Sequence, residues 1–306
     1  MAIFVVLAIV LFNVIAGFND GGNLLATTST TRRSAKQIVV WILLAVGLGP
    51  LLIGTRVADT IAYHLINIQI IGQVGLFEAV LVASAVVFGS WLAKVPTSLS
   101  LSLLGALLGM SVVRGAPPNW GGFLFSICAF FVVIAFGGGL AFGSTVMLRK
   151  FFSNRPATVF PKILHSIFVT LQGLAYGAND MEKAFGLLLI LKMSFWNSYA
   201  ITVLSFAAGL LIGGWSIASS VSGMFKMRSF EGLCTSVSTS LSVLIAALVG
   251  GPVSTSQTID STIFGMGVAS NPYRLNWNVA KRMAMSWALT SPIAFVVAIV
   301  VGAIWR

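Results

Sequence analysis

Two aspartates, each preceded by an asparagine, interrupt an otherwise apolar sequence. Asn19 and Asp20 end the first apolar run, and Asn179 and Asp180 end a later one, each pair with glycine within three positions. An acidic side chain inside a membrane segment usually marks an ion or substrate pathway. Carboxylate and amide oxygens with unwound backbone suit Na⁺ or a proton relay better than a soft metal. We therefore predict that Asp20 and Asp180 bind a cation; the alternative is that both cap helix ends in the headgroup layer.

Two hydroxyl-rich stretches form a second candidate site. One reads Pro96-Thr97-Ser98-Leu99-Ser100, and the other runs from Gly250 to Thr258 as Gly-Gly-Pro-Val-Ser-Thr-Ser-Gln-Thr. Proline opens a helix, and hydroxyls with freed N–H groups at the N-terminus of a half-helix favour an anion. A Ser/Thr-rich contact between helices is the alternative. The residues predicted to bind an anion are Thr97, Ser98, Ser100, Ser254, Thr255, Ser256 and Gln257.

Two lysines lie close to these candidate sites. Lys94 precedes Pro96 by two residues, in a stretch that is otherwise neutral. A fixed ammonium there would replace one bound Na⁺ or neutralise the anion directly, and a lysine that snorkels to the interface is the alternative. Lys183 is expected to pair with Glu182 or with Asp180.

The composition excludes a water-soluble protein. Of 306 residues, 58% are hydrophobic and 8% are charged, with only seven carboxylates, against roughly 25% charged residues in an ordinary soluble domain. Long runs without Asp, Glu, Lys or Arg, such as residues 1–19, 115–148 and 283–305, can each cross a bilayer. We predict roughly eight to twelve membrane elements in a multi-pass protein of the cell membrane. The first run resembles a signal-peptide core without a basic leader, and we expect it to remain as a membrane helix.

The net charge of +11 does not indicate nucleic-acid binding, because the basic residues lie between apolar runs rather than on one face. Lys and Arg concentrate in cytoplasmic loops, so the basic groups near positions 32–36, 149–162 and 226–228 predict three such loops and an N-terminus outside. Cys128 and Cys234 have no partner spacing for zinc or a disulfide framework, and we interpret them as packing residues.

The two halves of the chain repeat short motifs in the same order. Gly17-Phe18-Asn19-Asp20 recurs 160 residues later as Gly177-Ala178-Asn179-Asp180, and Leu-Leu-Ile-Gly at 51–54 recurs at 210–213. Such repeats are typical of secondary transporters, often with inverted halves and a midplane site. We predict a first repeat at residues 1–148, a basic cytoplasmic linker at 149–162 and a second repeat at 163–306.

The expected fold is all-α, with breaks in two helices at the Asn-Asp pairs. Carboxylates that bind cations beside hydroxyls that bind an anion predict a cation-coupled oxyanion carrier. The expected elements are helices at 2–18, 38–55, 60–93, 121–147, 160–178, 196–250 and 278–305, helix breaks at 19–22 and 179–180, and hairpins around Pro96 and Pro252.

The Asn-Asp pairs, the Pro252-Val253-Ser254-Thr255-Ser256 loop and the segment from Asn276-Trp277 to Pro292 together resemble the inorganic phosphate transporter (PiT) family over nearly the whole chain. This resemblance implies an inverted-repeat fold with two re-entrant hairpins, symport of phosphate with Na⁺ or H⁺, and a homodimer. It also implies residue roles. Asn19, Asp20, Asn23, Asn179 and Asp180 would bind the coupling cation, and Ser98, Ser254, Thr255 and Ser256 would bind phosphate.

The chain departs from the family pattern at three places. Leu99-Ser100-Leu101 stands where the first hairpin usually continues Thr-Thr-His, Gln257 stands where His is common, and Lys183 stands where Asn is usual. Sulfate or a related oxyanion is therefore the alternative substrate. We expect no enzyme and no cofactor besides the coupling cation, because the carboxylates are divided between the halves and no nucleophile lies beside a base. An ion channel is a less favoured alternative, for which oligomeric pore rings are expected.

Overall fold

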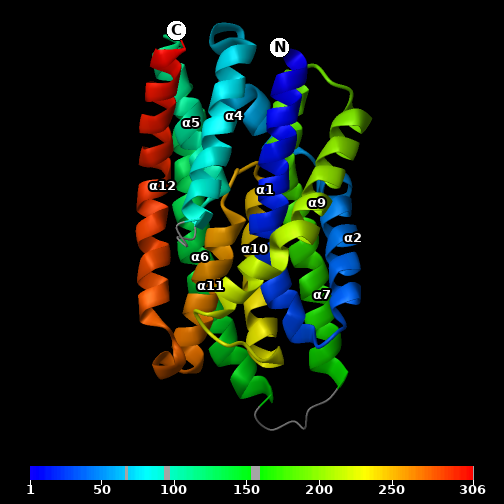
Figure 1. Ribbon diagram of the computed structural model, residues 1–306. Coiled ribbons are helices and arrows are strands. Elements are labelled where there is room, and N and C mark those ends of the chain that lie inside the picture. Colours follow the sequence, from blue (N-terminus) through cyan, green and yellow to red (C-terminus); the bar gives the residue numbers. More distant parts are fainter. Residues whose placement is uncertain (66–67, 93–96, 153–158, 306) are drawn as a thin grey trace.

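The computed structural model describes residues 1–65, 68–92, 97–152 and 159–305, and this part of the chain is helical with no strand (Figure 1). Short 3₁₀ or π-helical turns, labelled η1 to η4, join or extend several helices. These are η1 (Ser29–Thr31), η2 (Thr60–Leu65), η3 (Gly177–Met181) and η4 (Pro272–Arg274). The α-helices are α1 (Ala2–Thr28), α2 (Ala35–Ile53), α3 (Arg56–Asp59), α4 (Ile68–Leu92), α5 (Leu99–Val113), α6 (Trp120–Phe152), α7 (Val159–Tyr176), α8 (Glu182–Ile190), α9 (Phe195–Ser222), α10 (Ser229–Leu248), α11 (Thr255–Ser270) and α12 (Trp277–Ile304).

Seven helices of the described chain are long and apolar enough to cross a membrane. They are α1, α2, α4, α6, α9, α10 and α12. The number is below the predicted eight to twelve elements partly because α5 and α11 have only 15 and 16 residues. At 1.5 Å per residue these two helices extend about 22 Å and 24 Å, less than the roughly 30 Å of a hydrocarbon core.

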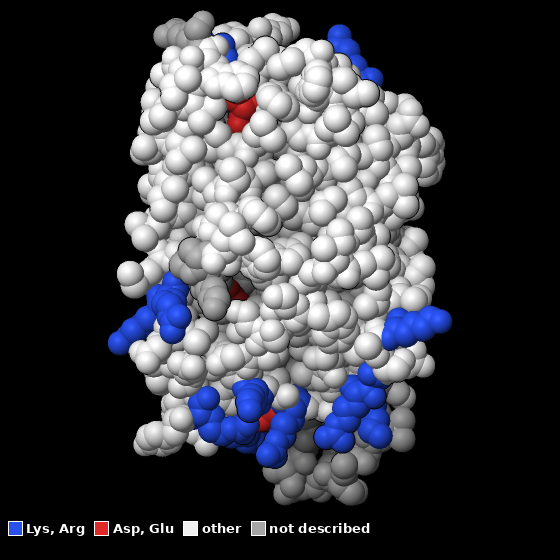
Figure 2. Space-filling view, in the orientation of Figure 1, with Lys and Arg blue, Asp and Glu red and all other residues white. Residues whose placement is uncertain are grey.

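Basic residues gather at the end of the molecule opposite the two chain termini (Figures 1 and 2). The connection from α1 to α2, the end of α6 and the connection from α9 to α10 all lie at this end. Arg149 at the end of α6 donates to the carbonyl oxygen and the hydroxyl of Ser270, the last residue of α11, so the ends of these two helices are joined. The positive-inside rule predicts that such a basic end faces the cytoplasm.

The helix packing follows the sequence repeat. A Cβ added at Gly17 would lie 2.0 Å from the carbonyl oxygen of Phe206, and one added at Gly177 would lie 1.9 Å from that of Val46. Gly177 lies 160 residues after Gly17, and Val46 lies 160 residues before Phe206. The crossing of α1 with α9 therefore has a counterpart in the crossing of α2 with the segment from α7 to η3.

A second pair of glycines repeats the relation. A Cβ at Gly209 would lie 1.9 Å from the carbonyl oxygen of Val14, and one at Gly49 would lie 2.3 Å from that of Leu174. The short helices behave alike, because α5 packs on α12 while α11 packs on α6. Close backbone approach at small residues is a common way for membrane helices to associate, since burial from water provides no drive within lipid.

The predicted helix break at residues 19–22 is wrong. Helix α1 continues through Asn19 and Asp20 to Thr28. Gly21 and Gly22 are helical, and they permit close packing rather than a break: a Cβ at Gly22 would lie 2.5 Å from the Cβ of Ile217 on α9. In the second half the predicted break at 179–180 is a π-helical turn, η3, between α7 and α8.

Other predicted boundaries also differ. The range 60–93 contains η2 and α4, with a non-helical Gly72 (φ 69°) inside α4, and the range 196–250 contains α9 and α10. The basic segment 149–162 is not a separate linker over its whole length, because α6 extends to Phe152 and α7 begins at Val159. Lys94 and Pro96, on which one hypothesis and the first hairpin depend, lie outside the described residues.

The glycine contacts predict a position-dependent cost of adding a methyl group. We expect Gly209→Ala to force α1 and α9 apart and to lower the free energy of unfolding by about 1–3 kcal/mol, the usual cost of overpacking. Gly139→Ala is the control, because nothing lies within 4 Å of its added Cβ. Thermal unfolding of the purified proteins in detergent measures both. Equal Tm values for the two variants would contradict this packing.

Candidate functional site

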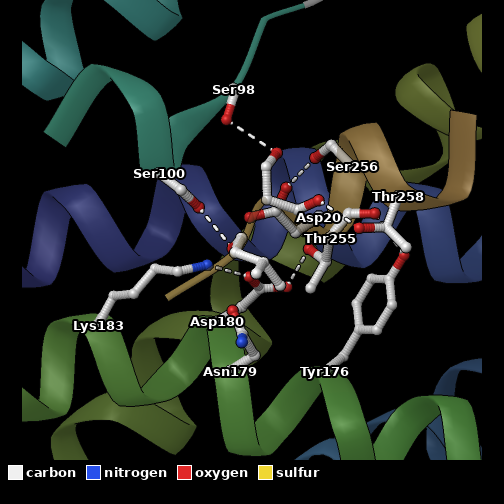
Figure 3. A network of polar contacts seen from close by, with 12 residues as sticks. Asp20, Ser98, Ser100, Tyr176, Asn179, Asp180, Lys183, Thr255, Ser256 and Thr258 are labelled. Atoms are coloured by element: carbon white, nitrogen blue, oxygen red, sulfur yellow. Dashed lines mark hydrogen bonds and ion pairs between the residues drawn. The ribbon is translucent and has the colours of Figure 1, made fainter. Parts of the chain in front are cut away.

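The two short helices α5 and α11 begin at the same point in the centre of the molecule. Ser98 caps α5 and Ser254 caps α11, and the Ser98 hydroxyl donates to Ser254 Oγ at 2.8 Å (Figure 3). The Ser100 hydroxyl donates to the carbonyl oxygen of Val253 at 3.0 Å. Each helix N-terminus has a partial positive charge and unpaired N–H groups. Two such ends that face each other favour an anion between them.

The first turn of α11 also binds the first aspartate. The Ser256 hydroxyl donates to Asp20 Oδ1, and the Asn19 amide donates to Asp20 Oδ1 at 2.8 Å and to Ser256 Oγ at 3.0 Å. All three side chains are buried. Asn23 lies nearby, three residues after Asp20 on α1, and is also buried. Carboxylate, amide and hydroxyl oxygens thus gather on one side of the α11 N-terminus.

The neighbouring residue of α11 binds the second aspartate. The Thr255 hydroxyl donates to Asp180 Oδ2, and Lys183 Nζ lies 2.5 Å from Asp180 Oδ1 (Figure 3). Asn179 donates to the carbonyl oxygen of Gly251 at 2.9 Å, and its own buried Oδ1 has no partner among the described residues. Carboxylate and amide oxygens of the kind that hard cations prefer thus lie close to the ammonium of Lys183.

The structure brings together most of the residues predicted for the site, and it places others differently. Thr97 Oγ1 lies 2.5 Å from Thr290 Oγ1, so this side chain contacts α12. Gln257 is buried, and neither of its amide atoms has a partner among the described residues. Of the two partners proposed for Lys183, the structure shows Asp180. Glu182 Oε2 instead accepts from the backbone N–H groups of Val57 and Ala58 at 3.0 and 3.1 Å.

The site therefore brings two buried carboxylates to the hydroxyls of consecutive residues at the N-terminus of α11. The sequence model of the phosphate transporter family matches this chain at residues 16–168 and 152–298. The chain belongs to this family. Membership indicates phosphate transport as its general function.

Two relatives share one description and match this chain over most of their length. The chain is 28% identical to a probable low-affinity inorganic phosphate transporter of Bacillus subtilis, over 96% of this chain and 94% of that protein. It is 27% identical to a protein of the same description from Rhizobium meliloti, over 92% of this chain and 90% of that one. These relatives are described as transporters, not as enzymes.

A solved structure has the same fold. The chain matches the structure titled "The sodium-dependent phosphate transporter" with a TM-score of 0.84, at 18% identity and over 99% of this chain and 98% of that chain. With seven candidate spans, this likeness confirms the prediction of an all-α, multi-pass membrane protein.

The motifs singled out in the sequence do not include one carboxylate that the structure places near the site. Asp260 lies one helical turn after Ser256 on α11, is buried, and has an Oδ1 without a partner among the described residues. The sequence repeat does not reveal Asp260, because the residue 156 positions earlier, at the matching place in the first half, is Leu104. The available signal was a single carboxylate in a run of neutral residues.

A cavity of about 300 Å³ reaches Asp260 and the Asp20 site. Asn19, Asn23, Ser256 and Asp260 line it, together with Ser220 in the last turn of α9. That turn lies at the basic end of the molecule, and Figure 2 shows an acidic side chain within a hollow in the lower half of this face. The cavity therefore connects the Asp20 site toward the basic end.

This cavity predicts the accessibility of an introduced thiol. In a Cys128→Ser/Cys234→Ser background, we expect Ser220→Cys to react with a membrane-impermeant maleimide applied from the basic side. Leu211→Cys is the control, because Leu211 is exposed on the same helix but does not line this cavity and faces hydrocarbon in a bilayer. Labelling of membrane vesicles of known orientation, read by mass shift, measures both. Labelling of Leu211→Cys alone would contradict the assignment.

Proposed function

We propose that the protein is a phosphate symporter coupled to Na⁺ or H⁺, in which Asp20 and Asp180 lie at the cation sites and the N-termini of α5 and α11 bind phosphate. One observation carries this proposal. Thr255 and Ser256 are consecutive residues of α11, and they donate to carboxylates from opposite halves of the chain. The same two hydroxyls lie at a helix N-terminus suited to an anion, so the cation and anion sites share atoms.

This sharing supplies a coupling mechanism. A serine or threonine hydroxyl has one proton to donate, and those of Thr255 and Ser256 are donated to Asp180 and Asp20. A cation or proton that neutralises a carboxylate weakens the hydrogen bond that the carboxylate accepts from the hydroxyl. The hydroxyl can then donate to phosphate instead. The cation also removes the repulsion between the carboxylate and the anion. Binding of cation and phosphate is therefore cooperative.

Alternating access follows from the arrangement of the halves. The exchanged contacts of α1 with α9 and of α2 with α7, together with the short helices that meet at their N-termini, support an inverted repeat with two re-entrant hairpins. In transporters of this kind one repeat moves against the other around a central site. The cavity toward the basic end supports an inward-facing arrangement.

The electrical work of import explains why a cation is needed. Each elementary charge that crosses 100 mV changes the free energy by about 2.3 kcal/mol, so a divalent anion entering a negative cell costs about 4.6 kcal/mol. Each cation carried with it returns about 2.3 kcal/mol at the same potential. A carrier without coupling would release phosphate from the cell instead of accumulating it.

Uptake of labelled phosphate into proteoliposomes tests the proposed function. We expect uptake to rise when an inward Na⁺ gradient, or an inward H⁺ gradient, replaces a choline gradient, and to persist in excess sulfate. Parallel assays with the two gradients decide which cation couples. Uptake that sulfate abolishes, or no phosphate uptake under either gradient, would contradict the proposal and favour the sulfate alternative.

The role of Asp20 has its own test. We expect Asp20→Asn to lower gradient-driven uptake by at least about tenfold, because the neutral amide loses the charge that attracts the cation, worth 1.4 kcal/mol or more. Asp59→Asn is the control, since Asp59 is exposed and lies outside the site. Initial rates at equal protein content measure the effect. Coupled uptake that survives in Asp20→Asn would exclude this role.

The serines that join the two helix ends are tested by phosphate binding. A hydrogen bond to a charged group contributes about 1.5–3 kcal/mol, so Ser254→Ala is expected to weaken phosphate binding by about 10- to 150-fold. Ser111→Ala is the control on α5, because that buried hydroxyl only donates to the Leu107 carbonyl oxygen of its own helix. Calorimetric titration with phosphate measures both, and equal affinities would contradict the assigned anion site.

A further inference from the structure

The cation site is asymmetric, although the motifs that build it are repeated. Asp20 and Asp180 are 160 residues apart, and so are the residues three positions after them, Asn23 and Lys183. A side chain three residues after another on a helix lies about one turn away on the same face. The repeat therefore places a neutral amide beside the first aspartate and an ammonium beside the second.

The ammonium of Lys183 is held at Asp180. Its Nζ lies 2.5 Å from Asp180 Oδ1, both side chains are fully buried, and the other carboxylate oxygen accepts from Thr255. Glu182 does not compete for the ammonium, because its Oε2 accepts from two backbone N–H groups of α3. Salt screens a buried ion pair much less than an exposed one. Lys183 thus pairs Asp180 with an ammonium that is part of the chain.

Asp20 has no such partner. Its carboxylate bonds to Asn19 and Ser256, and it forms no ion pair with a described residue. Asn23, which corresponds to Lys183, instead lines the cavity that leads toward the basic end. A cation entering that cavity finds the Asp20 carboxylate with amide and hydroxyl oxygens around it.

We propose that Lys183 takes the place of a coupling cation at Asp180, so that only the Asp20 site binds a cation that is carried with phosphate. The inference rests on the proposed function and specifies its stoichiometry. A covalently attached ammonium neutralises Asp180 as a bound Na⁺ would, but it cannot leave with the substrate. The protein then carries one cation fewer per phosphate than a carrier with two open aspartate sites.

The decisive variant is Lys183→Asn, which gives the second half the residue of the first. This substitution removes the ammonium and leaves only oxygen ligands beside Asp180. We therefore expect Na⁺ to bind at the position that the ammonium occupied. We expect the Tm of Lys183→Asn in choline buffer to be lower than the Tm of the unmodified protein. We also expect Na⁺ to raise the Tm of the variant by more than it raises the Tm of the unmodified protein, because a ligand stabilises the folded state that binds it.

Matched variants separate this effect from simple loss of packing. Lys226→Asn removes the same charge from an exposed position and is expected to leave the Na⁺ response unchanged. Lys183→Met has no oxygen with which to bind Na⁺, so its lowered Tm is expected not to recover to the same extent. A Lys183→Asn protein that is destabilised equally in Na⁺ and in choline would overturn the proposal.

Transport provides the second readout. In proteoliposomes we expect the Hill coefficient for Na⁺ in phosphate uptake to rise by about one in Lys183→Asn, as one binding site is added. An unchanged coefficient would overturn the proposal. So would loss of phosphate binding at every Na⁺ concentration, because that result would make Lys183 a direct ligand of the anion.

The two proposals fail in different ways. If the unmodified protein takes up no phosphate, the proposed function fails, while the Tm measurements, made without phosphate, still decide the role of Lys183. If Lys183→Asn does not fold in either buffer, Asn23→Lys provides the complementary test. It places an ammonium at the remaining site, and it is expected to abolish the Na⁺ response of Tm that the unmodified protein shows. A retained response would overturn the proposal.

Discussion

The hydrogen bonds from Thr255 and Ser256 to two buried carboxylates are the interactions on which the rest of the site depends. Acidic groups away from water are expensive unless they are paired and hydrogen-bonded. Asp20 comes from the first half of the chain and Asp180 from the second, and adjacent residues of α11 bind them. The start of α11 therefore connects both halves.

The scaffold around this point is more symmetric than the site itself. The close backbone contacts of two glycines in one half have counterparts in the other half at the 160-residue offset. The pairs of corresponding glycines are Gly17 with Gly177 and Gly49 with Gly209. The site differs between the halves at Lys183, which corresponds to Asn23, and at Asp260, which corresponds to Leu104. In the mechanism that we propose, the symmetric scaffold allows the halves to move against each other, and the unequal charges at the two aspartates set what each half binds.

Much of the site could be predicted from the sequence because its residues lie in repeated motifs. The duplicated Asn-Asp pairs and the Pro-Val-Ser-Thr-Ser loop indicate which carboxylates and hydroxyls meet. The contacts between them, from Ser98 to Ser254 and from Ser256 to Asp20, required the structure, since the partners lie 156 and 236 residues apart.

Two features of the site could not be predicted correctly from the sequence: the path of α1 through its glycines and the partner of Lys183. From the sequence, Gly21 and Gly22 favour a helix break, but in the structure α1 is continuous and these glycines let α9 approach it closely. The partner of Lys183 could not be decided, because Glu182 and Asp180 are both close in sequence. The backbone N–H groups of α3 decide it, as they bind Glu182 and leave Asp180 to the lysine.

The central claim is that the ends of α5 and α11 form one site for phosphate beside the cation site. Cross-linking of a Ser98→Cys/Ser254→Cys protein without its native cysteines tests it most directly, because the two hydroxyl oxygens lie 2.8 Å apart. We predict that a disulfide forms readily under mild oxidation and that phosphate together with the coupling cation slows its formation, whereas either alone has a smaller effect. A disulfide that forms at the same rate with and without both ligands, or no disulfide at all, would contradict the account.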